Sequence, residues 1–415
     1  MTITAGTSPA KDSSDLPGYP LARECPYRPS SGMAGLRAGG PITKVRLYDG
    51  RTAWLVTGPE EARLLLADKR MSSLAHYPNY PVLDERHLHM RATREMAREE
   101  EGGFAGALFG VDPPEHTRQR RMLLPHFTTR RVAAHRAEIQ RIVDGRLDVL
   151  LQQGPPADLL FDFAVPVPMM VICAFLGVPY EDRGRFEGPA RDLFDTERAG
   201  QAMEELNGYL ERLIESKSGE PGDGLLDDLI AGPVRAGELS LEELVQFASA
   251  ILIAGTVTST STIALGTLAL LSTPGQYAAL SQDPELVPGA VEEILRHVSL
   301  VESLSRVATD DVEVGGTLIK AGDGILVSFS GANLDPSVTS HPGELDITRP
   351  PANHLAFSYG IHHCMGHNLA RLELGIAFRT LVERIPTLAP VVPPSQIPWY
   401  FDFTVPRLLS FPVTW

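Results

Sequence analysis

The chain has few cysteines and almost no long apolar runs. Cys25, Cys173 and Cys364 are its three cysteines in 415 residues, and an odd, sparse set is typical of a reduced intracellular protein rather than a disulfide framework. The first residues are polar and rich in Pro and Ser, without the apolar centre of a signal peptide. Outside one Thr-rich helical stretch, no run of about 18 apolar residues appears. We therefore expect a cytoplasmic protein without a membrane span.

Basic residues are also in deficit. Lys and Arg number 37 against 52 Asp and Glu, which gives a net charge of −15. A charge of this sign argues against broad binding to nucleic acid, which depends on neutralising phosphates. No Gly-x-Gly-x-x-Gly motif opens a helix after a strand, and no cysteine cluster offers an iron–sulfur site. No nucleotide-binding or iron–sulfur site is therefore evident in the sequence.

The patterns that are present predict a mainly α fold with minor β. Residues 1–20 are expected to form a disordered leader, and no linker divides residues 21–415, which are expected to form a single domain. Segment 76–111 has no regular apolar spacing, which predicts a long loop, and loops of this length are often functional.

Short strands are predicted near both ends of the chain. Lys44–Val56 alternates apolar and polar residues around Asp49-Gly50, which predicts a β-hairpin with its turn at that dipeptide. Glycine-punctuated apolar runs predict further strands at Val312–Val314, Thr317–Ile319 and Ile325–Ser328.

Two long helices are predicted. Ser240 and Glu243 form a capping box, and the helix that they begin continues to Leu271, before a Ser-Thr-Pro-Gly stop. Its roughly 31 residues span about 46 Å, enough to cross the whole molecule. The second helix follows Cys364, and its core-facing stripe falls at i, i+4, i+7 and i+11. The stripe consists of Leu374, Phe378, Leu381 and Ile385.

Cys364 lies in a glycine-punctuated loop just before this second helix. Gly360 and Gly366 permit close approach of the backbone to a flat ligand. Free N–H groups and the positive dipole end of the following helix favour a thiolate. A haem iron held by that thiolate is one interpretation of the loop.

Three other interpretations of the loop remain open on residue types alone. His362, His363 and His367 crowd around the cysteine as zinc ligands might, but the second, more distant ligand pair of a structural zinc site is missing. A cysteine nucleophile needs a histidine partner in space, which a sequence does not show. The last interpretation is a buried, inert cysteine.

A longer pattern resembles a known family. Phe-x-x-Gly-x-His-x-Cys-x-Gly, followed by Leu-Ala, is similar to the haem-binding signature of the cytochrome P-450 family of soluble bacterial haem-thiolate monooxygenases. The resemblance implies a cytochrome P-450 fold, with haem b between a long distal helix and a proximal Cys loop. It makes Cys364 the iron ligand and implies that four loop residues contact the haem, namely Phe357, Gly360, His362 and Gly366.

Further motifs follow in the family's order over nearly the whole chain. Glu293 and Arg296 resemble the family's Glu-x-x-Arg, and their spacing of three puts both on one helix face. The resemblance gives them a role in holding the fold around the haem. The alternative is a surface ion pair, which contributes little.

A second set of residues resembles the family's partners of the haem propionates. His116 and Arg120 share one helix face, Arg306 lies in a predicted strand, and His362 lies in the Cys loop. Two buried carboxylates require cationic or N–H partners. The alternative for each residue is a solvated surface charge.

The first long helix resembles the family's distal helix at Ala254, Gly255, Val257 and Thr258. The two small residues would let the helix pass close over the haem. Thr258 takes the place of the alcohol that helps to deliver protons to dioxygen, but Val257 occupies the position of the usual acid. The alternative for these hydroxyls is a hydrogen bond to the i−4 carbonyl of their own helix.

The missing acid leaves three functions open. In the first, a substrate group or a water chain replaces the acid, and ordinary monooxygenation of a small organic molecule takes place, as in secondary metabolism. The second is atypical chemistry, such as oxidative coupling or cyclisation, a peroxygenase reaction or a nitric oxide-linked reaction. The third is a haem-binding sensor without turnover.

The resemblance also implies a substrate pocket and a redox partner. Loop 76–111, the helix near Ile251 and Ala254, Val301–Leu304 and Phe401–Thr404 are expected to line the pocket. Electrons from NAD(P)H are expected to arrive through a reductase and a separate ferredoxin or flavodoxin. The partner would dock on a basic patch of a monomer, made of Arg118, Arg121, Arg130, Arg131 and Arg371.

The loop adds a mixed, mainly basic set of side chains, which could meet an acidic or polar substrate or be solvated. This set consists of Arg86, His87, His89, Met90, Arg91 and Arg94.

Overall fold

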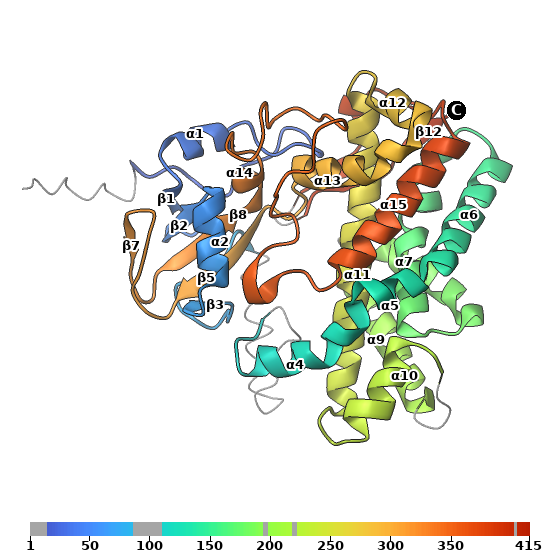
Figure 1. Ribbon diagram of the computed structural model, residues 1–415, viewed down its shortest axis with the longest axis horizontal. Helices are drawn as coiled ribbons and strands as arrows, with labels where there is room; N and C mark the ends of the chain where they lie inside the picture. Colours follow the sequence, from blue (N-terminus) through green and yellow to red (C-terminus); the bar gives the residue numbers. More distant parts are fainter. Residues whose placement is uncertain (1–14, 86–109, 194–197, 218–221, 402–404) are drawn as a thin grey trace, which may run out of the picture.

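Helices and a small sheet occupy opposite sides of the molecule (Figure 1). The computed structural model describes residues 15–85, 110–193, 198–217, 222–401 and 405–415. Within them, the helices gather on the side of the C-terminus, and the largest sheet lies beside the N-terminal segment. The mainly α architecture with minor β that the sequence predicts is confirmed.

The α-helices of the described residues are α1 Met33–Ala38, α2 Pro59–Ala67, α4 Glu115–Leu123, α5 Thr129–Ala134, α6 Arg136–Gln153, α7 Pro166–Leu176, α8 Glu187–Asp192, α9 Ala199–Lys217, α10 Leu225–Leu229, α11 Leu241–Ser272, α12 Gln276–Gln282, α13 Val287–Val298, α14 Phe329–Asn333 and α15 His367–Arg384. The strands are β1 Ile42–Arg46, β2 Thr52–Val56, β3 Met71–Ser72, β4 Ala157–Asp158, β5 Ser303–Ala308, β6 Val312–Val314, β7 Thr317–Ile319, β8 Gly324–Ser328, β9 Ala389–Pro390, β10 Trp399–Tyr400, β11 Arg407–Leu408 and β12 Pro412–Thr414.

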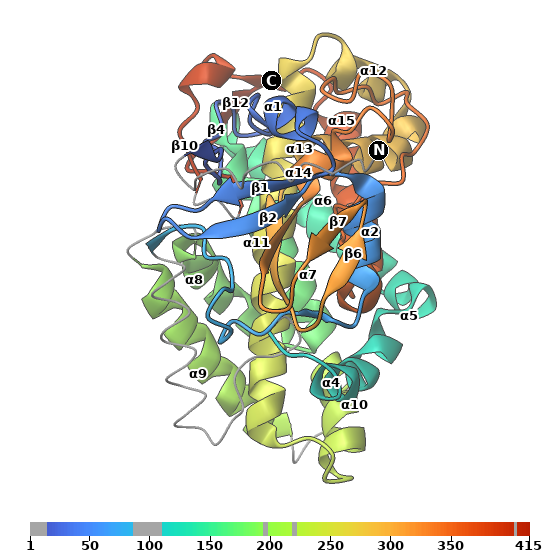
Figure 2. The same cartoon turned by 90° about the vertical axis from the view of Figure 1, so that its left-hand side faces the viewer.

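Helix α11 is the long helix that the capping box predicts. Ser240 Oγ accepts a hydrogen bond from the Glu243 backbone N–H at 3.0 Å, and the Glu243 carboxylate accepts one from the Ser240 N–H at 2.9 Å. The helix has 32 residues and ends at Ser272, one residue later than expected. It spans about 48 Å, runs the height of the molecule in Figure 1 and passes behind the sheet in Figure 2.

The same helix is long and apolar enough to cross a membrane by composition alone. However, 61% of its most apolar window is buried inside the protein, and it packs against α7, α9, α13 and α15. It is therefore the core helix of this fold.

The largest sheet has the strand order β1-β2-β8-β5-β3. The predicted hairpin is confirmed as β1 and β2, paired antiparallel with Lys44 opposite Trp54, although it begins earlier, at Ile42. Gly50 takes a positive φ of 83° in the turn, which suits glycine. β6 and β7 match their predicted bounds, and β8 begins one residue earlier than predicted, at Gly324.

The N-terminal segment corrects the expected boundary of the leader. The Tyr19 N–H donates to the Arg46 carbonyl, and the Arg46 N–H donates to the Pro17 carbonyl, both at 2.9 Å. Tyr19 is only 2% exposed. The segment is therefore attached to the edge of β1, and an unstructured leader over residues 1–20 extends too far.

The described residues form three apolar cores. The largest joins α6, α7, α11, α13 and α15, and the predicted stripe on α15 lies in it, since Leu374, Phe378 and Leu381 are at most 1% exposed. Two smaller cores lie on the sheet, one with α2 and α14 and one with α1. The Cys loop runs between the sheet side and α15 (Figure 1).

Candidate active site

Cys364 stands two residues before Gly366, which caps the N-terminus of α15. The Cys364 N–H donates to the Phe357 carbonyl at 2.8 Å, which closes the loop on itself. The sulfur accepts hydrogen bonds from the backbone N–H groups of Gly366 and His367. The loop therefore presents one sulfur atom at a helix N-terminus, as the sequence predicts.

The electrostatics of this sulfur have two opposing parts. Burial raises the pKa of the Cys364 thiol, and the N–H of Gly366 and the charges of Arg120 and Arg371 act in the other direction. Burial prevails, so the thiol is not acidic by itself. A bound metal ion displaces the thiol proton, and the same N–H groups and arginines then stabilise the thiolate.

The zinc and nucleophile interpretations gain no support. In the part of the chain that the structure describes, no three His, Cys, Asp or Glu side chains converge on a position for a metal ion. His363 and His367 pack edge to face, with centroids 4.7 Å apart. Among the described residues no imidazole nitrogen is hydrogen-bonded to the sulfur.

Two glycines near the site, Gly360 and Gly255, make close contacts that leave no room for a side chain. Gly360 has a φ of 72°, and a Cβ there would overlap the Leu66 carbonyl of α2. A Cβ on Gly255 would lie 2.5 Å from the Ile172 side chain of α7. Both positions therefore need glycine for close packing within the protein. The approach of Gly360 to a flat ligand and of Gly255 to the haem stays a prediction.

Gly366 is the glycine that faces the sulfur. A Cβ at this position would have one neighbour within 4 Å, the Cys364 Sγ at 4.0 Å. Its φ of −78° imposes no need for glycine. The glycine therefore keeps the space beside the sulfur open.

Four predicted residues from three distant segments form one basic cluster. The rings of His116 on α4 and His362 in the Cys loop lie 4.2 Å apart, centroid to centroid. Arg120 donates to the His363 carbonyl at 2.8 Å, and Arg306 on β5 donates to the Ser305 carbonyl at 2.7 Å. Sequence reasoning and structure agree that these residues gather.

Burial sets the protonation of the cluster. His116 is 2% and Arg306 is 6% exposed. Burial, followed by the charge of Arg306 and by His116, lowers the pKa of His362 to about 3. Burial, with the charge of Arg120, also lowers the pKa of His116. Both imidazoles are therefore neutral at neutral pH, and the positive charge resides on the two arginines.

Asp112 is a member of this region that the sequence reasoning missed. Its carboxylate accepts hydrogen bonds from the N–H and the hydroxyl of Ser73, at 2.9 and 2.8 Å. The Ser73 hydroxyl lies 3.5 Å from His362 Nε2. The sequence signal was its position directly before Pro113 and Pro114, which precede α4.

The cluster fits a ligand with two carboxylates. Within the described residues neither Arg120 nor Arg306 takes part in an ion pair, and their printed partners are backbone carbonyls. A buried cation without an anion is costly. Together with a sulfur ready for a metal, this set suits haem, whose propionates would meet the arginines and whose iron would meet Cys364.

A second ion-pair network supports the loop from the proximal side. Glu292 accepts hydrogen bonds from Arg371 at 2.7 and 2.9 Å, and its carboxylate lies 3.1 Å from His354 Nε2. Burial raises the Glu292 pKa, but the hydrogen bonds from His354 and Arg371 outweigh it and hold the pKa at about 2. The Arg371 guanidinium lies 4.5 Å from the centroid of the Phe357 ring.

Glu293 and Arg296 are buried, not a surface pair. They make two contacts, at 2.7 and 2.8 Å, and are 4% and 0% exposed. Arg296 also donates to the carbonyls of Asn333 and Pro342, at 3.2 and 2.7 Å. Arg349, which the sequence reasoning did not identify, adds a third charge, 3.3 Å from Glu293. The pair ties α13 to the chain that precedes the Cys loop.

The distal face of α11 combines small and hydroxyl side chains. Ala254, Val257 and Thr258 are half-buried. The Thr258 hydroxyl donates to the Ala254 carbonyl at 2.6 Å, which is the i−4 bond of the alternative interpretation. Because this hydrogen bond uses the hydroxyl proton, the Thr258 oxygen can only accept a hydrogen bond from another group. No acid stands at position 257 to complete the family's usual pair.

One buried acid near this face was also missed. Glu373 on α15 is 3% exposed and accepts a hydrogen bond from the Ser259 hydroxyl of α11 at 3.3 Å. Burial raises its pKa to about 8. The available signal was an acid directly before Leu374, the first residue of the predicted apolar stripe.

The predicted pocket lining is partly within the described residues. Ile251 is 7% exposed, and Val301 and Leu304 are half-buried against the sheet core. Phe401 lies under the Arg23 guanidinium, 5.2 Å from ring centroid to Cζ. In loop 76–111, residues 76–84 form neither helix nor strand. Residues 402–404 lie outside the described residues, as does the basic set Arg86, His87, His89, Met90, Arg91 and Arg94.

Several arginines of the expected docking patch are paired internally. Arg118 pairs with Glu115 at 2.7 Å and with Glu243. Arg131 pairs with Asp228, and Arg371 pairs with Glu292 as described above. These three are poor candidates for binding a partner.

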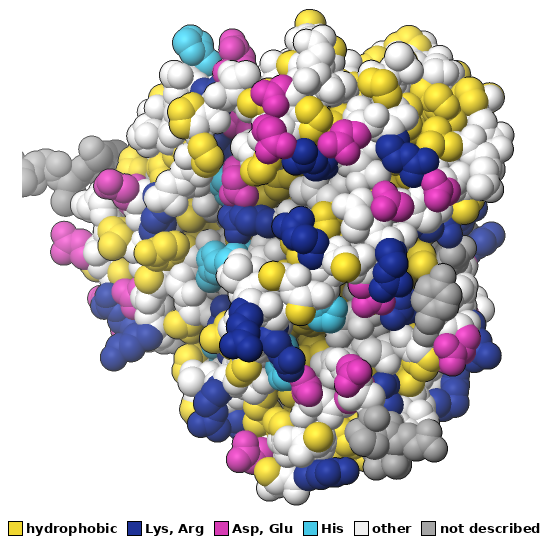
Figure 3. All heavy atoms as spheres, turned by 45° about the vertical axis from the view of Figure 1, so that its right-hand side comes forward, with side chains coloured by type: hydrophobic (Ala, Val, Ile, Leu, Met, Phe, Trp, Pro, Cys, Tyr) yellow, Lys and Arg dark blue, Asp and Glu magenta, His cyan; other side chains and the backbone are white. Residues whose placement is uncertain are grey.

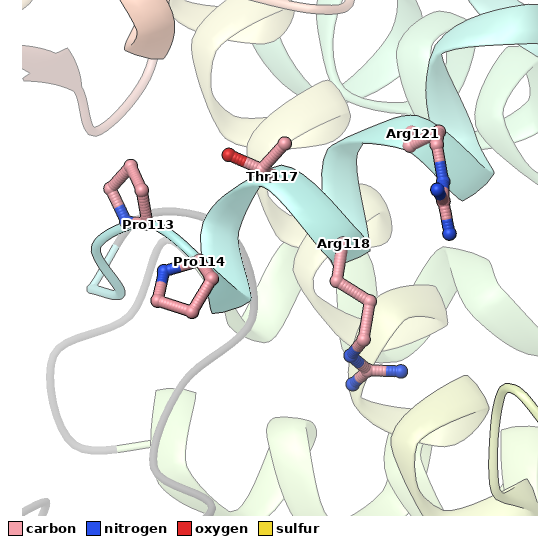
Figure 4. A pocket seen from close by; sticks show the side chains of 5 residues that line it. All are labelled: Pro113, Pro114, Thr117, Arg118 and Arg121. Carbon is pink, nitrogen blue, oxygen red and sulfur yellow. The ribbon is translucent and has the colours of Figure 1, made fainter.

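Arg121 and Arg130 take part in no ion pair within the described ranges. Figure 3 shows basic side chains in separate groups with acidic ones between them. A hollow at the start of α4 does not coincide with the basic cluster, and in Figure 4 its arginines extend from one side of the helix. It is lined by Pro113, Pro114, Thr117, Arg118 and Arg121.

Comparisons with known proteins agree with this geometry. The family model described as Cytochrome P450 matches residues 193–398. Pentalenic acid synthase of Streptomyces avermitilis is 45% identical over 412 residues, which are 99% of this chain and all of that protein. Vitamin D3 dihydroxylase of Streptomyces griseolus is 44% identical over 420 residues, and both chains are fully covered.

Solved structures show the same fold. The crystal structure of cytochrome P450 MoxA from Nonomuraea recticatena has a TM-score of 0.88 and 40% identity, and covers 96% of this chain and 98% of that one. The mycinamicin VIII C21 methyl hydroxylase of Micromonospora griseorubida has a TM-score of 0.84 and 36% identity, with 96% of this chain and 100% of that one covered. The chain belongs to the cytochrome P450 family and is an oxidoreductase of its monooxygenase type.

Proposed function

We propose that the protein hydroxylates a small, largely apolar organic molecule of secondary metabolism, with haem b bound through Cys364. The observation that carries the proposal is the convergence of three groups: Cys364 at a helix N-terminus, the buried Arg306 and the half-buried Arg120. Neither arginine forms an ion pair with a residue that the structure describes. Haem, once bound, supplies the activation of O₂ with two electrons. The residues of this chain supply binding, orientation and protons.

The basic cluster would hold the propionates by two kinds of contact. Arg120 and Arg306 would neutralise the two carboxylates, and buried charge-assisted hydrogen bonds are the strong ones. The neutral imidazoles of His116 and His362 would donate hydrogen bonds without adding charge. Asp112, bound to Ser73, would keep this wall of the site in place.

The distal face would position substrate and dioxygen. Ala254 and Val257 are small and apolar, so this part of α11 suits an apolar substrate surface rather than a charged one. Thr258, whose proton is committed to Ala254, would accept a hydrogen bond from a group in front of it. Relatives named for pentalenic acid, vitamin D3 and mycinamicin VIII support the substrate class.

The proposal is tested by reconstitution. Haem-loaded protein should show the reduced, CO-bound spectrum of a thiolate ligand, and Cys364→Ser should not. Candidate metabolites that shift the Soret band are then incubated with O₂, NADH and a surrogate ferredoxin and reductase. If the wild-type protein does not show the thiolate spectrum, the haem assignment is wrong. If NADH is consumed but no ligand is converted to a product, a sensor is favoured.

Atypical chemistry is the second candidate, and the observation that favours it is Val257. Val257→Glu should restore the usual acid. If the wild type gives a coupled or cyclised product and the variant a hydroxylated one, the missing acid determines the reaction. If Thr258→Ala changes neither product nor peroxide release, Thr258 has no part in proton delivery.

We also infer that one domain extends from Pro17 to Trp415, because the buried Arg23–Glu302 ion pair, at 2.8 Å, ties the N-terminal segment to β5 and its neighbours. The three cysteines are unpaired, which supports a cytoplasmic protein. We further propose a monomer that receives electrons from a ferredoxin-type partner docking near Arg121 and Arg130.

A further inference from the structure

The Arg23 guanidinium connects three segments that are distant in the chain. Its side chain is 0% exposed. It donates to the Glu302 carboxylate at 2.8 and 3.2 Å, and to the carbonyls of Val298 and Ser299 at 3.2 and 2.8 Å. The Phe401 ring covers it, with 5.2 Å from Cζ to the ring centroid. One planar group therefore joins the N-terminal segment, the chain between α13 and β5, and the residue after β10.

Ser299 has a strained backbone at the point where the chain leaves α13. Its φ of 41° lies in the left-handed region, which a residue other than glycine adopts at a cost. Arg23 donates to its carbonyl, its own hydroxyl donates to the Arg296 carbonyl at 2.7 Å, and the Asn333 side chain donates to that hydroxyl at 3.1 Å. Arg23 therefore helps to fix the direction in which residues 300–304 continue.

The strand that follows carries residues of the candidate active site. Arg306 on β5 belongs to the basic cluster that includes His362. Side chains two residues apart in a strand point to the same face, so the half-buried Leu304 lies on the face of Arg306. Glu302, which Arg23 binds, directly precedes this strand. A shift of the guanidinium would therefore move an apolar side chain beside the candidate haem site.

The strand pair next to Phe401 packs on the distal helix. β10 and β11 pair antiparallel, with Tyr400 opposite Arg407, and β11 lies against α11. The Arg407 guanidinium lies 4.9 Å from the centroid of the Tyr400 ring, which holds the two strands together. Phe401 directly follows β10. Its contact with Arg23 thus connects a strand pair on α11 to the start of β5.

We infer that Arg23 is a positioning residue for substrate selectivity. It fixes the separation between Leu304 on β5 and the chain at Phe401, both in segments of the expected pocket lining, and so determines how long an apolar group the site accepts. Arg23 acts through these two segments, because its own side chain has no exposed surface. The inference rests on the proposed function. A strut that only stabilises the fold is the competing explanation, and it predicts a loss of stability without a change in selectivity.

Two variants remove the connection in different ways. Arg23→Lys keeps a positive charge beside Glu302 but lacks the planar fork that binds the carbonyls and faces Phe401. Arg23→Met combined with Glu302→Gln leaves no unpaired buried charge, so it serves if the first variant does not fold. Arg28→Lys is the matched control. Arg28 is exposed, and its guanidinium lies over the neighbouring Tyr27 ring, 5.4 Å from Cζ to the centroid.

The first test applies whether or not haem is bound. Amide hydrogen exchange of the full-length protein, with and without haem, is followed by mass spectrometry in peptides that contain Glu302 and Phe401. Arg23→Lys should speed exchange in both peptides by about threefold or more, because both segments lose a shared anchor. Arg28→Lys should leave both unchanged. If either peptide of the Arg23 variants exchanges as in the wild type, the inference is overturned.

The second test measures selectivity without an identified substrate. 1-Alkylimidazoles, from methyl to dodecyl, bind haem iron through nitrogen and shift the Soret band. Their dissociation constants therefore report how long a chain the haem-loaded protein accepts. Both Arg23 variants should change the affinity for the long members, relative to 1-methylimidazole, by about threefold or more, as coupled contacts do. They should keep the thiolate spectrum. A series that is unchanged or shifted uniformly overturns the inference and leaves Arg23 as a strut.

The two proposals fail in different ways. If the haem-loaded wild type lacks the thiolate spectrum, the proposed function is wrong and the selectivity role of Arg23 falls with it. Hydrogen exchange then still reports whether Arg23 joins the two segments. If the spectrum is present and both variants match the wild type in the imidazole series, the positioning role is wrong and the monooxygenase assignment remains.

Discussion

The imidazole rings of His116 and His362 lie 4.2 Å apart, although one belongs to α4 and the other to the Cys loop. Two imidazolium ions at this distance would repel each other strongly, and the low pKa of His362, about 3, removes that repulsion. The net charge that faces an anion here therefore comes from Arg120 and Arg306.

Arg306→Leu should have opposite effects with and without haem. In the haem-free protein the guanidinium is buried without an anion, so its removal should raise the free energy of unfolding by about 1–3 kcal/mol. Haem affinity should fall by at least about tenfold, because a propionate loses a charge-assisted partner. Denaturant unfolding of both forms and haem transfer to a competing apoprotein measure the two effects. Destabilisation of the haem-free form would contradict the role of Arg306.

Arg296→Lys should be severely destabilising. Lysine cannot reproduce the forked contact with Glu293 and the bonds to the carbonyls of Asn333 and Pro342. Breaking a buried ion pair costs about 3–5 kcal/mol, and urea unfolding measures it. Arg379→Lys, in an exposed pair on α15, is the control and should change little. Equal effects of the two substitutions would mean that burial of the Glu293 pair is unimportant.

Acid should weaken the proximal network. The Glu292 pKa of about 2 lies below its ordinary value of 4.5, so the stabilisation is complete above pH 4.5 and is lost as the pH falls toward 2. The linkage amounts to roughly 2–3 kcal/mol. Unfolding free energies at pH 6, 4 and 3 should converge between wild type and Glu292→Gln. Parallel pH profiles would show that the carboxylate gains nothing from Arg371 and His354.

Electron transfer should depend on Arg121 and Arg130, which form no ion pair with a residue that the structure describes. Arg121→Glu and Arg130→Glu should slow reduction by a ferredoxin and flatten its dependence on salt, because surface charges steer association. Arg131→Glu should have less effect, since Asp228 already neutralises that side chain. Stopped-flow measurement of the reduction rate at several ionic strengths tests this prediction. A rate that is independent of salt in the wild type contradicts electrostatic docking.

Local patterns predicted the features that depend on neighbours in sequence. The capping box at Ser240, the turn at Gly50 and the stripe from Leu374 to Leu381 each follow from spacing, and each is confirmed. The Cys364 loop and the basic cluster became predictable through motifs that resemble a family. Their convergence from α4, β5 and the Cys loop depends on the tertiary structure, which local patterns do not encode.

Features that depend on burial in the folded protein could not be predicted from sequence patterns. The close contacts of Gly360 with Leu66 and of Gly255 with Ile172 join segments that are distant in the chain, so no local pattern predicted them. The high pKa of Glu373 arises from its burial. Its place beside Leu374 hinted at that burial, but the surrounding core comes from elements distant in the chain. For the same reason the internal pairing of the docking arginines was not foreseen.

The distribution of thiols has a practical consequence for measuring cofactor content. Cys173 is fully buried, and burial raises its pKa to about 12, so alkylating reagents should not reach it in the folded protein. Cys25 is half-buried and serves as an internal standard. Cys364 should react only in molecules whose sulfur is not bound to iron. Mass spectrometry of an alkylated preparation would therefore count haem-free molecules directly, without any optical measurement.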